Sequence, residues 1–86
     1  MQRGWVVSPD YRALIDALKA ARTHAGISQR ELARRVGKPP SFINKIELLE
    51  RRLDVLEFIA LAEAMDISPD ALMLRVRECL PATITL

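Results

Sequence analysis

The stretch QRELARRVGKPPSFINKIEL, residues 29–48, decides the fold, because it reads as two short helices joined by a tight turn. Ala33 lies in the first helical segment, and Ile43 and Ile46 lie at helical spacing in the second. A small side chain at Ala33 lets the two helices approach closely, and Gly37 between them adopts a positive φ at low cost. The pattern therefore predicts a rigid helix corner.

The residues of the second segment that do not point into this corner form a row of their own. Ser41, Asn44, Lys45 and Leu48 stand at positions i, i+3, i+4 and i+7, which is one face of a helix. Three of these four side chains are able to form hydrogen bonds, as a helix in the major groove of DNA requires.

Helix starts can be recognised on both sides of the corner by side chains that cap the first backbone N–H groups. They are Ser8 and Ser68, each followed by proline, and Ser28 and Asp54, each followed three residues later by glutamate. We expect Ser28 and Glu31 to cap each other's backbone. Gly26 suits the left-handed position after a helix end. The sequence predicts an all-α domain with helices over about residues 9–25, 28–36, 39–49, 54–65 and 68–79.

Each predicted helix also needs an apolar face. In the fourth segment we expect the face to consist of Leu56, Ile59, Leu61, Ala62 and Met65.

Size and composition exclude several classes of protein. With 86 residues the chain is one domain, too small for the cleft of most enzymes, and no nucleophile–base pair, paired acids or phosphate loop emerges. One cysteine, Cys79, and one histidine, His24, supply no metal-ligand set, and we expect no cofactor and no small-molecule ligand. No apolar run approaches the roughly 20 residues of a membrane span, so we expect a cytoplasmic, nucleoid-associated protein.

The charges are divided unevenly along the chain. Residues 1–52 hold 11 Lys and Arg against 5 Asp and Glu, whereas residues 53–86 hold 2 against 6. The first part is thus +6 and the second −4. A basic part of this kind suits nucleic acid, because neutralising phosphates releases counterions, although a solvated charged surface explains the charge equally well.

Residues 18–72 resemble the lambda-repressor/Cro-type helix-turn-helix family, often called XRE-like. The most specific parts are Gly26-Ile27-Ser28-Gln29 with Glu31-Leu32-Ala33, the pair Ile43 and Ile46-Glu47, and the closing run Ala62-Glu63-Ala64-Met65-Asp66-Ile67-Ser68. The resemblance implies a DNA-binding transcriptional regulator, with residues 39–49 as its recognition helix.

The resemblance also implies roles for individual residues. Those matching base-reading positions are Pro40, Ser41, Asn44 and Lys45. Those matching phosphate contacts are Arg22, Ser28, Gln29, Lys38, Arg51 and Arg52. We expect Glu47 to be structural and to pair with Arg22 or Arg35.

The chain departs from the family pattern at both ends of the recognition helix. Pro39 and Pro40 remove N–H donors from its start, which weakens phosphate capture there. Leu49 stands where a glycine usually follows, so either the helix runs on toward Glu50 or Leu49 takes a left-handed conformation at roughly 1 kcal/mol. We favour the longer helix.

Dimerisation is predicted from an apolar surplus near the C-terminus. The residues assigned to a homodimer interface are Met73, Leu74, Val76, Leu80, Ile84 and Leu86. The alternative is an ordinary core face followed by a frayed tail. We divide the chain into an N-terminal arm at 1–8, the domain with its dimerisation helix at 9–80, and a tail at 81–86. Trp5 belongs to the arm. Three alternatives stay open for it: a disordered arm, a patch folded on the core, or part of a surface that binds a partner.

The complete prediction is a repressor that binds an inverted repeat in double-stranded DNA as a homodimer. A rival prediction is an antitoxin-like or anti-repressor protein whose main role is to bind a second protein.

Overall fold

The first and last helices begin as their Ser-Pro signals predict. The structure, a computed structural model, describes residues 8–86, so the prediction for Trp5 lies outside the described residues. Helix α1 (Pro9–His24) starts after Ser8, whose Oγ accepts a hydrogen bond from the Tyr11 backbone N–H at 3.0 Å. Helix α5 (Pro69–Glu78) starts after Ser68, which caps Ala71 in the same way at 3.1 Å. Both starts are confirmed.

The two predicted capping boxes have different outcomes. Before α4 (Val55–Ala64), Asp54 and Glu57 cap each other reciprocally, as the box requires. Before α2 (Gln29–Arg35), Ser28 caps Glu31, but the Glu31 carboxylate does not return the bond. It accepts hydrogen bonds from two arginines of its own helix instead, so the prediction of a reciprocal box is wrong there.

Helix α3 (Ser41–Glu47) is shorter than the predicted segment 39–49 at both ends. Pro40 precedes it as the N-cap residue, and Leu49 adopts φ +63°, so the expectation of a longer helix is wrong. The reason is burial: the Leu49 side chain is only 4 % exposed. A left-handed residue costs roughly 1–2 kcal/mol, which is offset by the roughly 1.5–3 kcal/mol from burying a leucine side chain.

Four successive helices end in one and the same way. A left-handed residue follows each of α1 to α4, namely Gly26, Gly37, Leu49 and Asp66. The next residue then donates its N–H back into the helix, as from Lys38 to the Ala33 carbonyl at 2.9 Å. Each chain reversal is therefore closed by local hydrogen bonds, which keeps the helices short and their connections tight.

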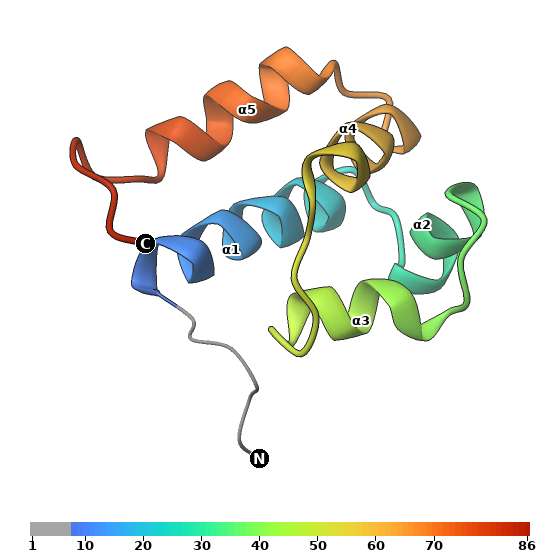
Figure 1. Cartoon of the computed structure of the whole chain (residues 1–86). Coiled ribbons are helices and arrows are strands. Elements are labelled where there is room, and N and C mark those ends of the chain that lie inside the picture. Colours follow the sequence, from blue (N-terminus) through green and yellow to red (C-terminus); the bar gives the residue numbers. More distant parts are fainter. Residues whose placement is uncertain (1–7) are drawn as a thin grey trace.

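Helix α1 lies in the middle of the domain, and the other helices pack around it to form one core. Figure 1 shows α5 and α3 on opposite sides of α1, with α2 beside α3. Within residues 8–86 the five helices occur without any strand, which confirms the all-α prediction. The buried apolar side chains are Ile15, Leu18, Ala21, Leu32, Ala33, Phe42, Ile43, Ile46, Leu49, Phe58, Leu61, Ala62, Met65, Leu72 and Val76.

The buried face of α4 differs from the predicted one. Phe58, Leu61 and Ala62 are buried, whereas Leu56 is 78 % exposed and Ile59 is also exposed. Phe58, Leu61, Ala62 and the following Met65 stand at i, i+3, i+4 and i+7, and this row excludes Leu56 and Ile59. The prediction for those two residues is wrong, and they add to the apolar surface.

The C-terminal tail, residues 81–86, is held against the domain. Arg77 donates hydrogen bonds to the carbonyls of Pro81 at 2.9 Å and Ala82 at 3.3 Å. The Thr85 N–H donates to Asp10 Oδ2 at 2.6 Å, which joins the tail to the start of α1. The alternative of a frayed tail does not describe this structure.

Candidate nucleic-acid interface

A buried ion pair fixes the end of α3 to the rest of the domain. Arg22 of α1 donates to both carboxylate oxygens of Glu47, through Nε at 2.7 Å and Nη2 at 3.0 Å. Gln29 of α2 donates to Glu47 Oε1 at 2.7 Å, and Arg22 Nη1 also reaches the Ile27 carbonyl at 2.8 Å. Glu47 thus ties three helices together, and its predicted pairing with Arg22 is confirmed.

This network changes the roles expected for two residues. The Arg22 side chain is 10 % exposed and holds Glu47 and Ile27, so it is a structural residue rather than the predicted phosphate contact. Gln29 is half-buried and its side-chain amide donates to Glu47, so this N–H group is already engaged within the domain. The pairing of Glu47 with Arg22 was expected, but the hydrogen bond from Gln29 was not, because Gln29 lies 18 residues from Glu47 and nothing local relates the two.

The helix corner itself has the geometry that its sequence predicts. Ala33 of α2 is fully buried, Ile43 and Ile46 of α3 are buried in the core, and Gly37 takes φ +71°. A β-carbon at Gly37 would meet no other atom, so backbone conformation alone explains the glycine. The corner holds α3 at a fixed angle to α2.

The outer row of α3 is open to solvent. Ser41, Asn44, Lys45 and Leu48 are all exposed, as the helical spacing predicts. Pro40, also exposed, offers no side-chain cap, and its neighbour Pro39 accepts the Phe42 N–H at 2.9 Å. The start of α3 therefore presents apolar proline rings, and the hydrogen-bonding groups begin at Ser41.

Cations flank α3 and are positioned by aromatic rings. Lys38 Nζ lies 5.6 Å and Arg51 Cζ 4.8 Å from the centroid of the Phe42 ring. Arg52 Cζ lies 4.8 Å from the centroid of the Tyr11 ring. Cation–π contacts hold such side chains in place without neutralising them. The Phe42 ring therefore contacts one cation from the segment before α3, Lys38, and one from the segment after it, Arg51.

The predicted phosphate residues differ in how far they are already engaged. Arg51 donates to Glu57 at 2.9 and 2.5 Å, and this hydrogen-bonded guanidinium holds the pKa of the Glu57 carboxyl below its ordinary value. A phosphate must compete with Glu57 for Arg51.

Two other predicted phosphate residues are more accessible. Lys38 is exposed, and exposed Ser28 keeps its hydroxyl proton available while its oxygen caps α2.

The predicted dimer residues separate into three groups. Met73, Leu74, Ile84 and Leu86 are exposed, and Leu80 is half-buried. Val76 is 3 % exposed and packs in the core of a single chain, so its assignment to the interface is corrected. Val55, at the start of α4, is a further exposed apolar residue, at 74 %, that the sequence analysis did not single out.

Two kinds of site are not found in the part of the chain that the structure describes. No group of three His, Cys, Asp or Glu residues stands close enough to hold a metal ion. Among the same residues, no helix is long and apolar enough to cross a membrane.

Comparisons with known proteins agree with this geometry. A family model described as Helix-turn-helix matches residues 18–72. A solved structure of an XRE-family like protein from Pseudomonas syringae pv. tomato str. DC3000 is 46 % identical, with a TM-score of 0.75 over 84 % of this chain and 88 % of that chain.

A second similarity concerns the fold alone. A structure of the clp gene regulator ClgR from C. glutamicum is 19 % identical, with a TM-score of 0.72 over 86 % of this chain and 95 % of that chain. A search among curated proteins gives no significant match.

Proposed function

Because the chain belongs to the helix-turn-helix family, in its lambda-repressor/Cro-type (XRE-like) branch, we propose that it represses transcription by binding an inverted repeat as a homodimer. Family membership makes it a DNA-binding transcriptional regulator and not an enzyme. The mechanism is occupancy: each copy places α3 in a major groove and excludes other proteins from that DNA. The proposed location is the cytoplasm, at the nucleoid, where such a regulator meets its DNA.

The observation that carries this proposal is the exposed row of α3 on a rigid corner. Lys45 donates to guanine O6 or N7, Asn44 serves adenine or a phosphate, and Ser41 pairs with several base edges and discriminates little. Pro40 contacts a thymine methyl group or sets the approach angle. Readout therefore depends mainly on Asn44 and Lys45.

Affinity comes from the cations beside this row. Lys38 and Arg52 are exposed next to α3 and suit the flanking phosphates, with Arg51 joining where a phosphate displaces Glu57. The hydroxyl of Ser28 and the remaining groups of Gln29 suit the backbone at the start of α2. The acidic part of the chain, residues 53–86, forms α4 and α5, and α5 lies across α1 from α3 (Figure 1).

Selection of bound sequences from a random DNA pool tests the proposal. We expect a symmetric consensus whose half-sites lie about 10 base pairs apart, one turn of the double helix. Enrichment of an unsymmetrical site would refute the inverted repeat, and absence of any enrichment would refute sequence-specific binding. A reporter whose promoter overlaps the selected site then tests repression, because an activator would raise its expression.

Two variants separate base reading from phosphate binding. Lys45→Ala is expected to change the preferred base at one position of each half-site. Lys38→Ala, the control, is expected to weaken binding to all sequences alike and to reduce the slope of log affinity against log salt by about 1. Equal losses of Lys45→Ala on selected and random DNA would contradict its base-reading role.

A further inference from the structure

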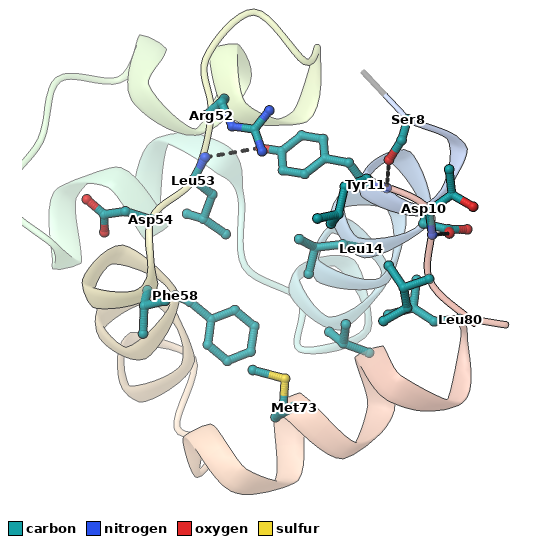
Figure 2. A pocket seen from close by; sticks show the side chains of 15 residues that line it. Ser8, Asp10, Tyr11, Leu14, Arg52, Leu53, Asp54, Phe58, Met73 and Leu80 are labelled. Atoms are coloured by element: carbon teal, nitrogen blue, oxygen red, sulfur yellow. Dashed lines mark hydrogen bonds between the residues drawn. The ribbon is translucent and has the colours of Figure 1, made fainter. Parts of the chain in front are cut away.

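An apolar groove lies on the side of the domain where the C-terminal tail meets the start of α1. It has a volume of about 330 Å³ and runs between the start of α1, the connection before α4, the helix α5 and the tail. Figure 2 shows Leu14, Leu53, Phe58, Met73 and Leu80 among the side chains that line it. The groove is separate from the exposed row of α3.

The polar groups along the groove are already engaged within the chain. The Tyr11 hydroxyl accepts the Leu53 N–H at 3.0 Å, and Asp10 accepts the Thr85 N–H at 2.6 Å (Figure 2). Asp54 caps α4 by accepting the Glu57 N–H at 2.7 Å. The guanidinium of Arg52 also lines the groove and lies over the Tyr11 ring, with its Cζ 4.8 Å from the ring centroid. The other walls are formed mainly by apolar side chains, so the surface that fits the groove is mainly apolar.

Exposed apolar side chains extend the groove at its rim. Val55 and Met73 line the groove and are 74 % and 50 % exposed, and Ile84 and Leu86 of the tail line it and are exposed as well. A small molecule inside the groove would leave these apolar side chains in water. A protein surface is large enough to cover the groove and its rim together.

The tail supplies a self-complementary partner for the groove. It stands beside the groove, held by Arg77 and Asp10, and exposes Ile84 and Leu86. An interface with twofold symmetry uses the same patch on both copies, so a protrusion and its recess must lie on one surface. The groove and the tail meet this requirement.

The position of the groove also suits two copies on one DNA. Residues 52–55 line the groove and follow directly on the segment that ends α3. Contact at this place brings two α3 helices together near their C-terminal ends and leaves their outer rows uncovered. A contact through the exposed row itself would block DNA.

We infer that a second copy of this chain covers the groove, with Ile84 and Leu86 of each copy packed into the groove of the other. The inference rests on the proposed homodimer and names its surface. It removes Leu74 from the predicted interface, because Leu74 is exposed but does not line the groove, and it adds Val55.

Two neighbouring residues of α5 provide a matched test. Met73→Glu puts a charge on the groove wall, whereas Leu74→Glu, at a residue that is 60 % exposed, puts the same charge outside it. Sedimentation equilibrium of the full chain should give twice the 9.7 kDa mass for the wild type and for Leu74→Glu. For Met73→Glu the dimer dissociation constant should rise by roughly tenfold or more. Val55→Glu, whose acid favours the first turn of α4, should behave like Met73→Glu without harming the fold.

A mixing experiment tests the reciprocal packing. Leu86→Lys weakens the tail and Met73→Glu weakens the groove, so each variant alone should form a much weaker dimer than the wild type. In a mixture, the intact tail of the Met73→Glu copy meets the intact groove of the Leu86→Lys copy, and the two introduced charges attract each other. A heterodimer that is tighter than either homodimer supports the inference, and monomers in the mixture overturn it.

The outcomes also separate this inference from the proposed function. A wild-type dimer that survives in both Met73→Glu and Val55→Glu overturns the groove interface and leaves the proposed homodimer standing. A wild-type chain that is monomeric in solution and binds the selected DNA as one copy overturns both. An apolar compound released on denaturing a monomeric wild-type protein assigns the groove to a ligand and also overturns the inference.

Discussion

Glu47→Ala is expected to destabilise the domain strongly, because Glu47 accepts three hydrogen bonds in the interior. The side chains of Arg22 and Glu47 are 10 % and 8 % exposed, so the pair belongs to the buried class. Removing one partner of a buried pair costs about 3–5 kcal/mol, since the other charge is left without compensation. For a domain of this size each kcal/mol lowers Tm by roughly 4–8 °C, so Tm should fall by roughly 12 °C or more.

Urea unfolding followed by circular dichroism measures this loss directly. The matched control is Glu31→Ala, which removes an acid that also pairs with arginine but on the exposed surface of α2, and its loss should be much smaller. Combining Glu47→Ala with Arg22→Met should cost less than the sum of the two single changes, because the stranded charge is then gone. An additive double variant, or a Glu47→Ala loss no larger than that of the control, would refute the reasoning.

Three further outcomes follow from backbone strain and ion pairing. Leu49→Gly relieves φ +63° but removes a buried side chain, so it should lower the free energy of unfolding by roughly 1–3 kcal/mol in urea unfolding. Asp66→Gly, at φ +59° with its side chain exposed, should instead leave stability unchanged or raise it by up to about 1 kcal/mol, and a clear loss would contradict the strain argument. Hydrogen bonds from Arg34 and then Arg35 lower the pKa of Glu31 from 4.5 to about 2, so its contribution is present above pH 4.5 and is lost as the pH falls toward 2. The Tm difference between wild type and Glu31→Gln should therefore shrink over that interval, and a constant difference would show that the ion pair is not its cause.

Local chemistry made much of this protein predictable from its sequence. The caps at Ser8 and Ser68 need only a side chain and a backbone N–H three residues away, and the box at Asp54 is equally local. The helix corner and the exposed row of α3 follow from helical spacing over a few turns. Signals of this short range do not depend on how the rest of the chain folds.

Other features were decided by contacts between distant parts of the chain. Nothing local shows that Leu49 is buried enough to end α3 in a left-handed turn, or that α4 buries Phe58 in place of Leu56. The arginine that was expected on a phosphate instead holds Glu47, because three helices converge there.

The apolar groove is the clearest case of a surface that only tertiary structure creates. Its walls come from residues 8–14, 52–58, 73–80 and 84–86, which meet only when α1, α4, α5 and the tail are packed. The sequence by itself determined the class of protein, most of the helix starts and the exposed row of α3, because these depend on neighbours along the chain. Only the folded domain decided which apolar side chains remain exposed to solvent, because burial depends on how whole helices pack against one another.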